Sequence, residues 1–538
     1  MKKFLSLIIL FCALGLQAQD RALQQQLRKL QMAEYAINQL YVDSVNDGKL
    51  VEAAIKSMLS QLDPHSTYTT PEETKELNEP LNGNFDGIGI QFQMMEDTLL
   101  VIQPVSDGPS ERVGILAGDR IIAVNDTSIA GKKYSSDDII KRLRGPRGTQ
   151  VKLTVLRRGL KDLLNFNVKR DKIPITSIDA VYMADPGIGY IRVNKFAATT
   201  GEEFHEALVK LKDQGMIDLI LDLQDNGGGY LNAAIDMANE FLNQKDLIVY
   251  TEGRSSRRQN YYAKGNGIFR EGKLIVLVNE YTASASEIVS GAIQDWDRGL
   301  IVGRRSFGKG LVQRPINLSD GSMIRLTTAR YYTPTGRCIQ KPYQTNADGT
   351  KSDSGNQSDY NKELAERYLH GELMHADSIH LPDSLRYSTL KLQRSVYGGG
   401  GIMPDYFVPL DTTLYTDYHR QVSAQGLILK TSTNYIEGHR KELAKKYKDF
   451  NTFNRQFEVD EEILGYLRSE AEKLDIKFNQ EQYDYSLPYI KLQLKGLIAR
   501  DLWDMSEYYH VMNSNNKSVQ AALQLLQSNN FLLSHLDR

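Results

Sequence analysis

Hydroxyl side chains cluster in the stretch NEYTASASEIVSG, residues 279–291, directly after a short apolar run. Ser284 and Glu287 match the S-x-x-E capping box, in which each residue satisfies a backbone donor of the other at the start of a helix. The same position suits a nucleophile, because a serine on a strand-to-helix turn is exposed at the sheet edge and the N–H of Ala285 can face a developing oxyanion. The pattern gives Ser284 two compatible interpretations, a helix cap and a nucleophile.

A serine nucleophile needs a base, and histidine is a poor candidate in this chain. The nearest histidines, His205 and His370, lie 79 residues before and 86 residues after Ser284. The stretch TASAS also lacks the glycines of the G-x-S-x-G turn of the α/β-hydrolases. Lys309 lies 25 residues after Ser284, between two glycines in SFGKG, where close backbone approach can exclude water. Because a desolvated lysine favours its neutral form, and a neutral amine accepts a proton from serine, Lys309 is the better candidate base.

The stretch GRRSFGKG that carries this lysine also matches the phosphate loop G-x-x-x-x-G-K of nucleotide hydrolases. The next residue is Gly310, where a phosphate loop needs Ser or Thr to hold magnesium. The following LVQRPINLSDG predicts a strand and a turn where a phosphate loop requires a helix. Nucleotide binding is therefore disfavoured.

A second glycine cluster, DNGGGYL, follows a predicted strand that ends at Leu223. It has two interpretations, a tight strand-to-helix connection and an oxyanion loop. In the second, Gly228 or one of its neighbouring glycines is the donor beside Ala285.

Length and charge limit the classes of protein to consider. The 538 residues exceed what one hydrophobic core supports, so several domains are expected. Sixty-five Lys and Arg residues against 67 Asp and Glu residues give a net charge of -2, which offers no electrostatic case for binding nucleic acid. No H-E-x-x-H or comparable ligand spacing is present, so we expect neither a metal nor a cofactor.

The N-terminal residues MKKFLSLIILFCALGLQAQD resemble a secretory leader, with two lysines, an apolar stretch and small residues up to Ala18. Cleavage is expected after Ala18. No later segment reaches the roughly 20 apolar residues of a membrane span. We therefore expect an exported protein without a transmembrane anchor, in the periplasm. Cleavage after Ala18 would remove Cys12, so Cys338 would have no partner and we expect no intrachain disulfide.

The distribution of apolar residues predicts a multidomain α/β protein. Helical spacing precedes a compact segment of short β-rich runs, and alternating strands and helices then indicate a layered α/β core whose strands are buried on both faces. A polar insertion interrupts this core, and residues rich in helix formers follow it. The expected parts are a leader at 1–18, a helical segment at 19–82, a β domain at 83–172, the α/β core at 173–342 and 398–410, a flexible insertion at 343–397, and a helical domain at 411–538.

Together these features resemble the C-terminal processing peptidases, or tail-specific proteases, which are Ser/Lys peptidases. TASASEI, GRRSFGKGLVQ, DGSMIRLTTARYYTPTGRCIQ and GIMPD carry the resemblance, and LDPHSTY near the N-terminus also fits. The resemblance implies that Ser284 is the nucleophile, that Lys309 is the general base, and that Gln313 holds the lysine amine. It gives Asp295 a supporting role. The family usually has Asn-Pro-Gly-Gly after the second strand, whereas Gly227 replaces the proline here.

The β domain resembles a PDZ domain, with a merely structural β barrel as the alternative. GIGIQF occupies the place of the PDZ carboxylate-binding loop and edge strand, and PSERVGILAGDRIIAVNDTSI matches the middle of such a domain. The resemblance implies that an extended peptide adds as a strand, with its terminal carboxylate on backbone N–H groups. The expected peptide-binding residues are Gly87, Ile88, Gly89 and Ile90.

The expected function is that of a secreted serine endopeptidase that selects proteins by exposed apolar C-terminal tails. The alternative is a catalytically silent PDZ scaffold in the periplasm. A homo-oligomer and an adaptor protein are further candidate partners, and nucleic acid is not an expected partner.

Overall fold

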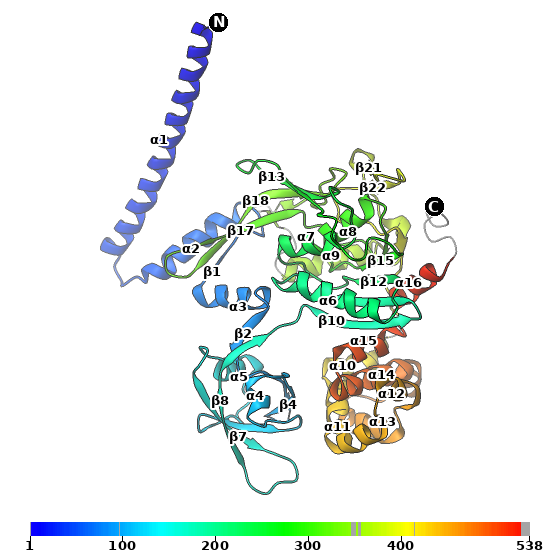
Figure 1. Cartoon of the computed structure of the whole chain (residues 1–538). Coiled ribbons are helices and arrows are strands. Elements are labelled where there is room, and N and C mark those ends of the chain that lie inside the picture. The colour runs from blue at the N-terminus through cyan, green and yellow to red at the C-terminus, as the bar shows by residue number, and fades with distance from the viewer. Residues whose placement is uncertain (1, 96, 346–350, 353–356, 414, 529–538) are drawn as a thin grey trace.

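The computed structural model describes residues 2–95, 97–345, 351–352, 357–413 and 415–528, without the side chains of residues 2–20 and of those between 344 and 361. Figure 1 shows an extended N-terminal helix, a separate β domain, a layered central core and a bundle of helices near the C-terminal end. This is the helical, β, α/β and helical order that the sequence predicts.

The N-terminal segment is mostly helical and leads into the central core. Its elements are α1 (Lys2–Leu40), α2 (Asp47–Ser60), β1 (Thr67–Thr69) and α3 (Pro71–Leu81). Thr70 begins α3 with a capping box to Glu73, as the turn-rich sequence before it predicts. β1 pairs with β18 (Met323–Tyr332), a strand of the sheet beside the central core, so this segment is docked there. No helix in the described part of the chain is both long enough and apolar enough to cross a membrane.

The β domain is a small antiparallel sheet with two helices and its own apolar core. β3 is an edge strand, because the sheet order is β3-β4-β5-β7-β8, with β6 beside β5. A separate ribbon of β2 with β9 joins the domain to the rest of the chain. The elements are β2 (Asn84–Gly87), β3 (Ile90–Met95), β4 (Thr98–Pro104), α4 (Pro109–Arg112), β5 (Arg120–Val124), β6 (Thr127–Ser128), α5 (Ser136–Leu143), β7 (Gln150–Leu156), β8 (Leu164–Lys169) and β9 (Asp171–Pro174).

The central core is built on a six-stranded sheet of order β10-β11-β12-β15-β16-β23, in which only the β10–β11 pair is antiparallel. Helices α6, α7 and α8 pack on one face, and α16 packs on the other. All five residues of β15 are buried, as expected for a strand covered on both faces. The bounds are β10 (Ile178–Asp185), β11 (Ile188–Val193), α6 (Thr200–Asp213), β12 (Asp218–Asp222), α7 (Leu231–Asn239), β15 (Leu274–Val278), α8 (Ala285–Asp295), β16 (Leu300–Gly303), β23 (Tyr406–Phe407) and α16 (Lys517–Gln527).

A second, antiparallel sheet lies beside this core. Its longest strand, β18, pairs with β1, β13 and β17, so the N-terminal segment and the core meet on one strand. The members besides β1 are β13 (Leu247–Glu252), β14 (Gln259–Tyr262), β17 (Leu311–Asn317) and β18 (Met323–Tyr332).

The insertion expected to be flexible at 343–397 contains regular elements where the structure describes it. Residues 346–350 and 353–356 lie outside the described part. Arg367 of the insertion donates to the backbone oxygen of Arg305, which ties this segment to the core. Its elements are β19 (Gln344–Thr345), β20 (Lys351–Ser352), α9 (Gln357–Leu369), the 3₁₀ turns η1 (Ala376–Ser378) and η2 (Asp383–Leu385), β21 (Arg386–Ser388) and β22 (Ser395–Tyr397).

The residues after 411 form helices, as predicted, but these helices serve two cores. The first six share an apolar cluster of their own, whereas α16 contributes to the cluster on the second face of the six-stranded sheet. The first six are α10 (Asp417–Ala424), α11 (Leu427–Lys446), α12 (Phe450–Gln456), α13 (Glu461–Lys473), α14 (Gln480–Leu502) and α15 (Met505–Asn513).

Candidate active site

Ser284 lies on the turn between β15 and α8, at the carboxyl edge of the parallel strands. Its backbone has φ 58° and ψ −113°. A positive φ is unusual for a residue with a side chain, and such strained conformations are held in place by their surroundings and concentrate at functional sites. Ser284 therefore occupies the first-turn position that its two interpretations require.

One cavity brings together the residues predicted for catalysis. Its volume is about 760 Å³, and Ser284, Ala285, Lys309, Gln313 and Gly228 all line it. These residues come from α8, β17 with the loop before it, and the loop after β12, so distant parts of the chain converge here. Helix α3 of the N-terminal segment supplies part of the wall through Asn78 and Leu81.

Two buried side chains, Glu287 and Tyr331, hold the turn at Ser284 against the lysine loop, residues 304–310, which carries Lys309. The Glu287 carboxylate accepts the backbone N–H groups of Ser284 (2.8 Å), Gly308 (2.7 Å) and Lys309 (2.9 Å), and the hydroxyl of Ser306 (2.5 Å). The bond to Ser284 is the carboxylate half of the predicted capping box, whereas the other three bonds cross to the lysine loop. Burial raises the pKa of Glu287, although the hydrogen bonds oppose that shift.

Tyr331 of β18 makes a similar bridge. Its hydroxyl lies 3.0 Å from the backbone oxygen of Ser284 and 2.5 Å from that of Lys309. Burial raises the pKa of Tyr331 well above its ordinary value, so the phenol stays protonated and can donate. The sequence reasoning missed Tyr331 and treated Glu287 only as a cap. The only signal for Tyr331 is its place within RLTTARYY, two residues after Ala329 on the same face of a strand.

The glycine loop after β12 approaches Ser284 closely. A Cβ atom on Gly228, which has φ +96°, would lie 2.8 Å from the Ser284 Cβ and 2.9 Å from the Ala285 nitrogen. A side chain at Gly228 would therefore collide with the nucleophile turn. The N–H of Gly228 donates to Oδ1 of Asn226 at 2.9 Å in this conformation. As an oxyanion donor, Gly228 would have to share or exchange that bond.

Gln313 lies on β17 at the cavity wall and connects to the N-terminal segment. Its amide nitrogen is 3.4 Å from Oγ1 of Thr327, which in turn donates to Asp63 at 3.0 Å. Asp63 also accepts from the backbone and the hydroxyl of Ser66. The LDPHSTY stretch thus supports the strand pair that carries Gln313.

Asp295 is at the other end of α8, eleven residues from Ser284 and so about 16 Å along the helix axis. Its carboxylate is fully buried, lies 2.7 Å from the guanidinium of Arg337, and accepts from the backbone and hydroxyl of Thr335. These contacts fix the turn that follows β18. The structure therefore places Asp295 outside the cavity, in a position that suits the supporting role expected of it.

The remaining serines and the alternative phosphate loop have structural explanations. The Ser286 hydroxyl donates to the backbone oxygen of Asn226, and the Ser290 hydroxyl donates to that of Ser286. The chain after Lys309 enters the strand β17, so the helix that a phosphate loop needs does not follow. Among the described residues, no group of three or more His, Cys, Asp or Glu side chains is placed to hold a metal ion.

The four residues predicted to bind peptides lie where β2 passes into the edge strand β3. Gly87 ends β2, Gly89 has φ +71°, and Ile90 begins β3. Ile88 is buried in the core of the β domain, and its backbone oxygen accepts from Ser110. This geometry leaves an edge strand preceded by a glycine turn, which is the arrangement that strand addition uses.

Comparisons with known proteins agree with this architecture. The description "Peptidase family S41" matches residues 187–353, and "PDZ domain" matches residues 87–170. "Activating protease CtpB N-terminal domain" matches residues 14–74, and a family of unknown function matches residues 418–504.

A carboxy-terminal-processing protease of Bartonella bacilliformis is 39% identical over 305 residues, which are 56% of this chain and 69% of that protein. The chain belongs to this family of S41 peptidases. A probable CtpA-like serine protease of Staphylococcus epidermidis is 36% identical over 327 residues, which are 60% of this chain and 65% of that protein. The chain therefore spans just under two thirds of that relative. A solved photosystem II D1 C-terminal processing protease is 31% identical, with a TM-score of 0.33, and covers 57% of this chain and 89% of that one.

The predicted family and the predicted multidomain fold are thus confirmed. The roles of the individual site residues stay predictions.

Proposed function

We propose that the chain is an exported serine endopeptidase that cleaves proteins selected by their C-terminal tails. The observation that carries the proposal is the convergence of Ser284, Lys309 and the Glu287 bridge at one cavity. A merely capping serine would not need a second loop, with a lysine on it, fastened to its own helix by a fully buried carboxylate.

In the first step, the Ser284 hydroxyl attacks the scissile carbonyl carbon while the Lys309 amine takes its proton. The oxygen of the tetrahedral intermediate becomes negatively charged and accepts from the N–H of Ala285, with Gly228 as the second donor once its bond to Asn226 is shared. The peptide C–N bond then breaks, and the protonated lysine returns the proton to the leaving amine. An acyl ester on Ser284 remains.

In the second step, water attacks the ester carbon and gives its proton to Lys309. The ester bond breaks, the proton returns to the Ser284 oxygen, and a new carboxylate leaves. Gln313 positions the lysine amine in both steps. The bonds from Glu287 and Tyr331 keep the two loops in register, so both steps use a preformed geometry.

Substrate selection is assigned to the β domain. A chain end adds to the edge strand β3, with its carboxylate on backbone N–H groups of the Gly87–Ile90 turn and its last side chain against apolar residues of the domain. Proteins with exposed apolar C-termini are therefore the proposed partners. The leader-like residues before Ala18 support export, with the periplasm as the proposed location.

Cleavage of an unfolded model protein tests the catalytic part. Ser284→Ala and Lys309→Met should each abolish cleavage, because neither half of the dyad works alone. Ser255→Ala and Lys210→Met, two exposed positions, are the matched controls and should remain active. Full activity of Lys309→Met would contradict the lysine's role. Tail binding without any cleavage by the unaltered protein would instead indicate a catalytically silent scaffold.

A second comparison tests tail selection. A substrate with a free apolar C-terminus should be cleaved faster than the same protein with an amidated C-terminus, because the turn at Gly87–Ile90 binds the carboxylate. Equal rates for the two substrates would refute tail recognition by this turn and leave the dyad untouched.

A further inference from the structure

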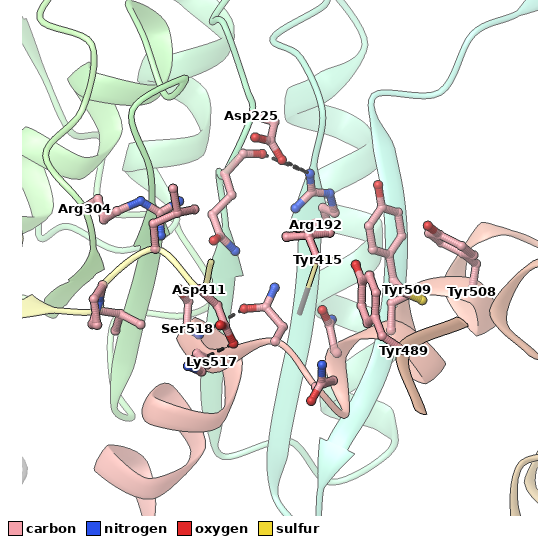
Figure 2. Close-up of a pocket in the computed structure, with 18 residues that line it drawn as sticks. Arg192, Asp225, Arg304, Asp411, Tyr415, Tyr489, Tyr508, Tyr509, Lys517 and Ser518 are labelled. Atoms are coloured by element: carbon pink, nitrogen blue, oxygen red, sulfur yellow. Dashed lines mark hydrogen bonds and ion pairs between the residues drawn. The ribbon is translucent and has the colours of Figure 1, made fainter. Parts of the chain in front are cut away.

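A second cavity, of about 410 Å³, lies between the central sheet and the C-terminal helices. One wall is formed where the parallel strands end, with Arg192 from β11, Asp225 after β12, Arg304 after β16 and residues 408–411 after β23. Figure 2 shows Arg192 of this wall facing Tyr509 of the helical domain. In open α/β sheets, ligands bind in crevices outside the carboxyl ends of the strands. The volume is also within the roughly 300–1,000 Å³ of small-molecule sites.

Every charged side chain that lines this second cavity is already paired with an opposite charge. Arg192, which is buried, lies 2.7 Å from Asp222 and 3.0 Å from Asp225. Arg304 pairs with the buried Glu280 at 2.7 Å. Figure 2 also shows the pair of Lys517 with Asp411, whose atoms are 2.9 Å apart. An anionic or cationic ligand would have to break one of these pairs, so the charges fix the walls and do not select a charged ligand.

The opposite wall is aromatic. Tyr415 and Tyr489 meet edge to face with ring centroids 5.7 Å apart, and Tyr508 and Tyr509 do so at 5.2 Å. Burial raises the pKa of Tyr509 to about 12, so its hydroxyl stays protonated near neutral pH. The guanidinium of Arg192 lies over the Tyr509 ring, 4.7 Å from its centroid, and so covers one face of it. An uncovered tyrosine ring presents an apolar face and a hydrogen-bonding tip to the same ligand.

Planar amides complete the lining. Gln224, Asn513, Asn515 and Asn516 each carry a donor nitrogen and an acceptor oxygen in one plane. The nitrogen of Gln224 already donates to Asp222, and that of Asn513 donates to the hydroxyl of Tyr182. Asn516 uses its oxygen to cap α16, accepting from the backbone of Ser518, so the start of that helix is already satisfied. An anion therefore finds no vacant helix terminus here.

We propose that this second cavity binds a neutral polyhydroxylated ligand, a sugar or short oligosaccharide. A sugar ring has an apolar C–H face that can lie on a tyrosine ring, and hydroxyl groups that both donate and accept from planar amides. A peptide is the poorer fit, because strand addition needs a free sheet edge and these residues follow the ends of paired strands.

A neighbouring cavity shows in which direction a longer ligand extends. It has a volume of about 520 Å³ and shares Asp225, Arg304 and Leu410 with the second cavity. Its other lining residues include Leu364 and Tyr368 of α9. The shared residues make the two spaces adjacent, with the helical domain on one side and the insertion on the other.

The test measures binding to the full-length protein by calorimetry and does not depend on peptidase activity. The probes are the neutral trisaccharides maltotriose, cellotriose and triacetylchitotriose, with a neutral capped tripeptide as the competing class. At least one trisaccharide should bind, and Tyr415→Ala should weaken that binding about tenfold or more, equivalent to about 1.4 kcal/mol. The matched control is Tyr485→Ala on α14, an exposed tyrosine outside both cavities that should leave binding unchanged.

Three outcomes would overturn the proposal. The first is that no trisaccharide binds up to about 10 mM, where even a weak site with a Kd near 1 mM would be filled. The second is trisaccharide binding that Tyr415→Ala does not change. The third is binding of the capped tripeptide alone. Because Tyr415 is 42% exposed, its truncation is not expected to unfold the domain. Asn515→Ala, a second change in the same lining, provides an independent check.

Discussion

Replacement of Glu287 by glutamine tests whether one buried carboxylate holds the two catalytic loops together. Four donors point at this side chain, two at each carboxylate oxygen. A glutamine keeps the shape but has one acceptor oxygen, so its amide nitrogen must face a pair of donors. If that nitrogen faces Ser306 and Gly308, the serine hydroxyl can turn and accept, and one backbone N–H is left without a partner.

The expected cost follows from this count. One unsatisfied buried N–H costs about 1–3 kcal/mol, and the remaining bonds lose the strength that a charged acceptor gives them. Removing a buried charge works in the opposite direction. We expect Glu287→Gln to lower the free energy of unfolding by about 1–3 kcal/mol at neutral pH. Glu287→Ala, which abandons all four donors and leaves a cavity, should lower it by about 4 kcal/mol or more.

Urea unfolding of the variants, with Glu206→Gln on the exposed side of α6 as the control, measures these differences. At urea concentrations where Glu287→Gln is folded, its kcat should fall while its KM changes little, because the loops rather than the substrate contacts are altered. Equal stability and equal kcat for Glu287→Gln and the unaltered protein would refute the bridging role.

The same carboxylate predicts a pH dependence of stability. Burial raises the folded-state pKa of Glu287 above the ordinary 4.5, so the folded protein binds this proton more tightly than the unfolded chain. The contribution of this proton binding to the free energy of unfolding is fully present below pH 4.5 and is lost as the pH rises through the folded-state pKa of Glu287. The stability difference between the unaltered protein and Glu287→Gln should therefore shrink as the pH rises above 4.5. A difference that grows with pH across that window would contradict the sign.

Three further predictions concern the glycine loop, the far end of α8 and the last helix. Gly228→Ala should remove cleavage, because its Cβ would lie 2.8 Å from the Ser284 Cβ. Gly227→Ala, whose Cβ meets no atom within 4 Å, should remain active, and equal activities of the two variants would contradict the close approach. Asp295→Asn should cost about 3–5 kcal/mol of unfolding free energy, because it leaves the fully buried Arg337 without its charge partner, and exposed Asp213→Asn is the control. Leu525→Ala should lower the free energy of unfolding by about 2–5 kcal/mol by opening a cavity under α16, whereas the exposed Gln524→Ala should change it little. Urea unfolding measures this pair and the Asp295 pair. A loss below about 0.5 kcal/mol for Leu525→Ala would argue against α16 as part of the core.

The sequence predicted those parts of the site that are encoded locally. The turn at Ser284 and the run of buried strands follow from patterns of a few residues, and the prediction of Lys309 depends on its flanking glycines. The bonds from Glu287 to Gly308 and Lys309 could not be predicted in this way, because a capping box looks complete with Ser284 alone. The bond of Gly228 to Asn226 depends on the exact loop conformation, which three successive glycines leave undetermined.

The C-terminal helices show the same limit at larger scale. Their amphipathic spacing predicted helices, and helices are present after residue 411. The spacing of Val519, Ala522, Leu525 and Leu526 indicates an apolar face but does not identify what covers it. In the structure that face lies on β12, β15 and β16, strands that precede it by more than two hundred residues. Long-range partners of this kind are decided by the folded surfaces and not by local pattern.

The position of α16 also sets the order of events during synthesis. β16 ends at Gly303 and α16 begins at Lys517, so 213 residues must be made between the last central strand of the sheet and the helix that covers its second face. At roughly 5–20 residues per second, this takes about 10–40 s. During that time the growing chain already contains Ser284 and Lys309, but one side of the sheet beneath them is bare. Until α16 has been made, the growing chain therefore lacks part of its core, even though both residues of the proposed dyad are already present.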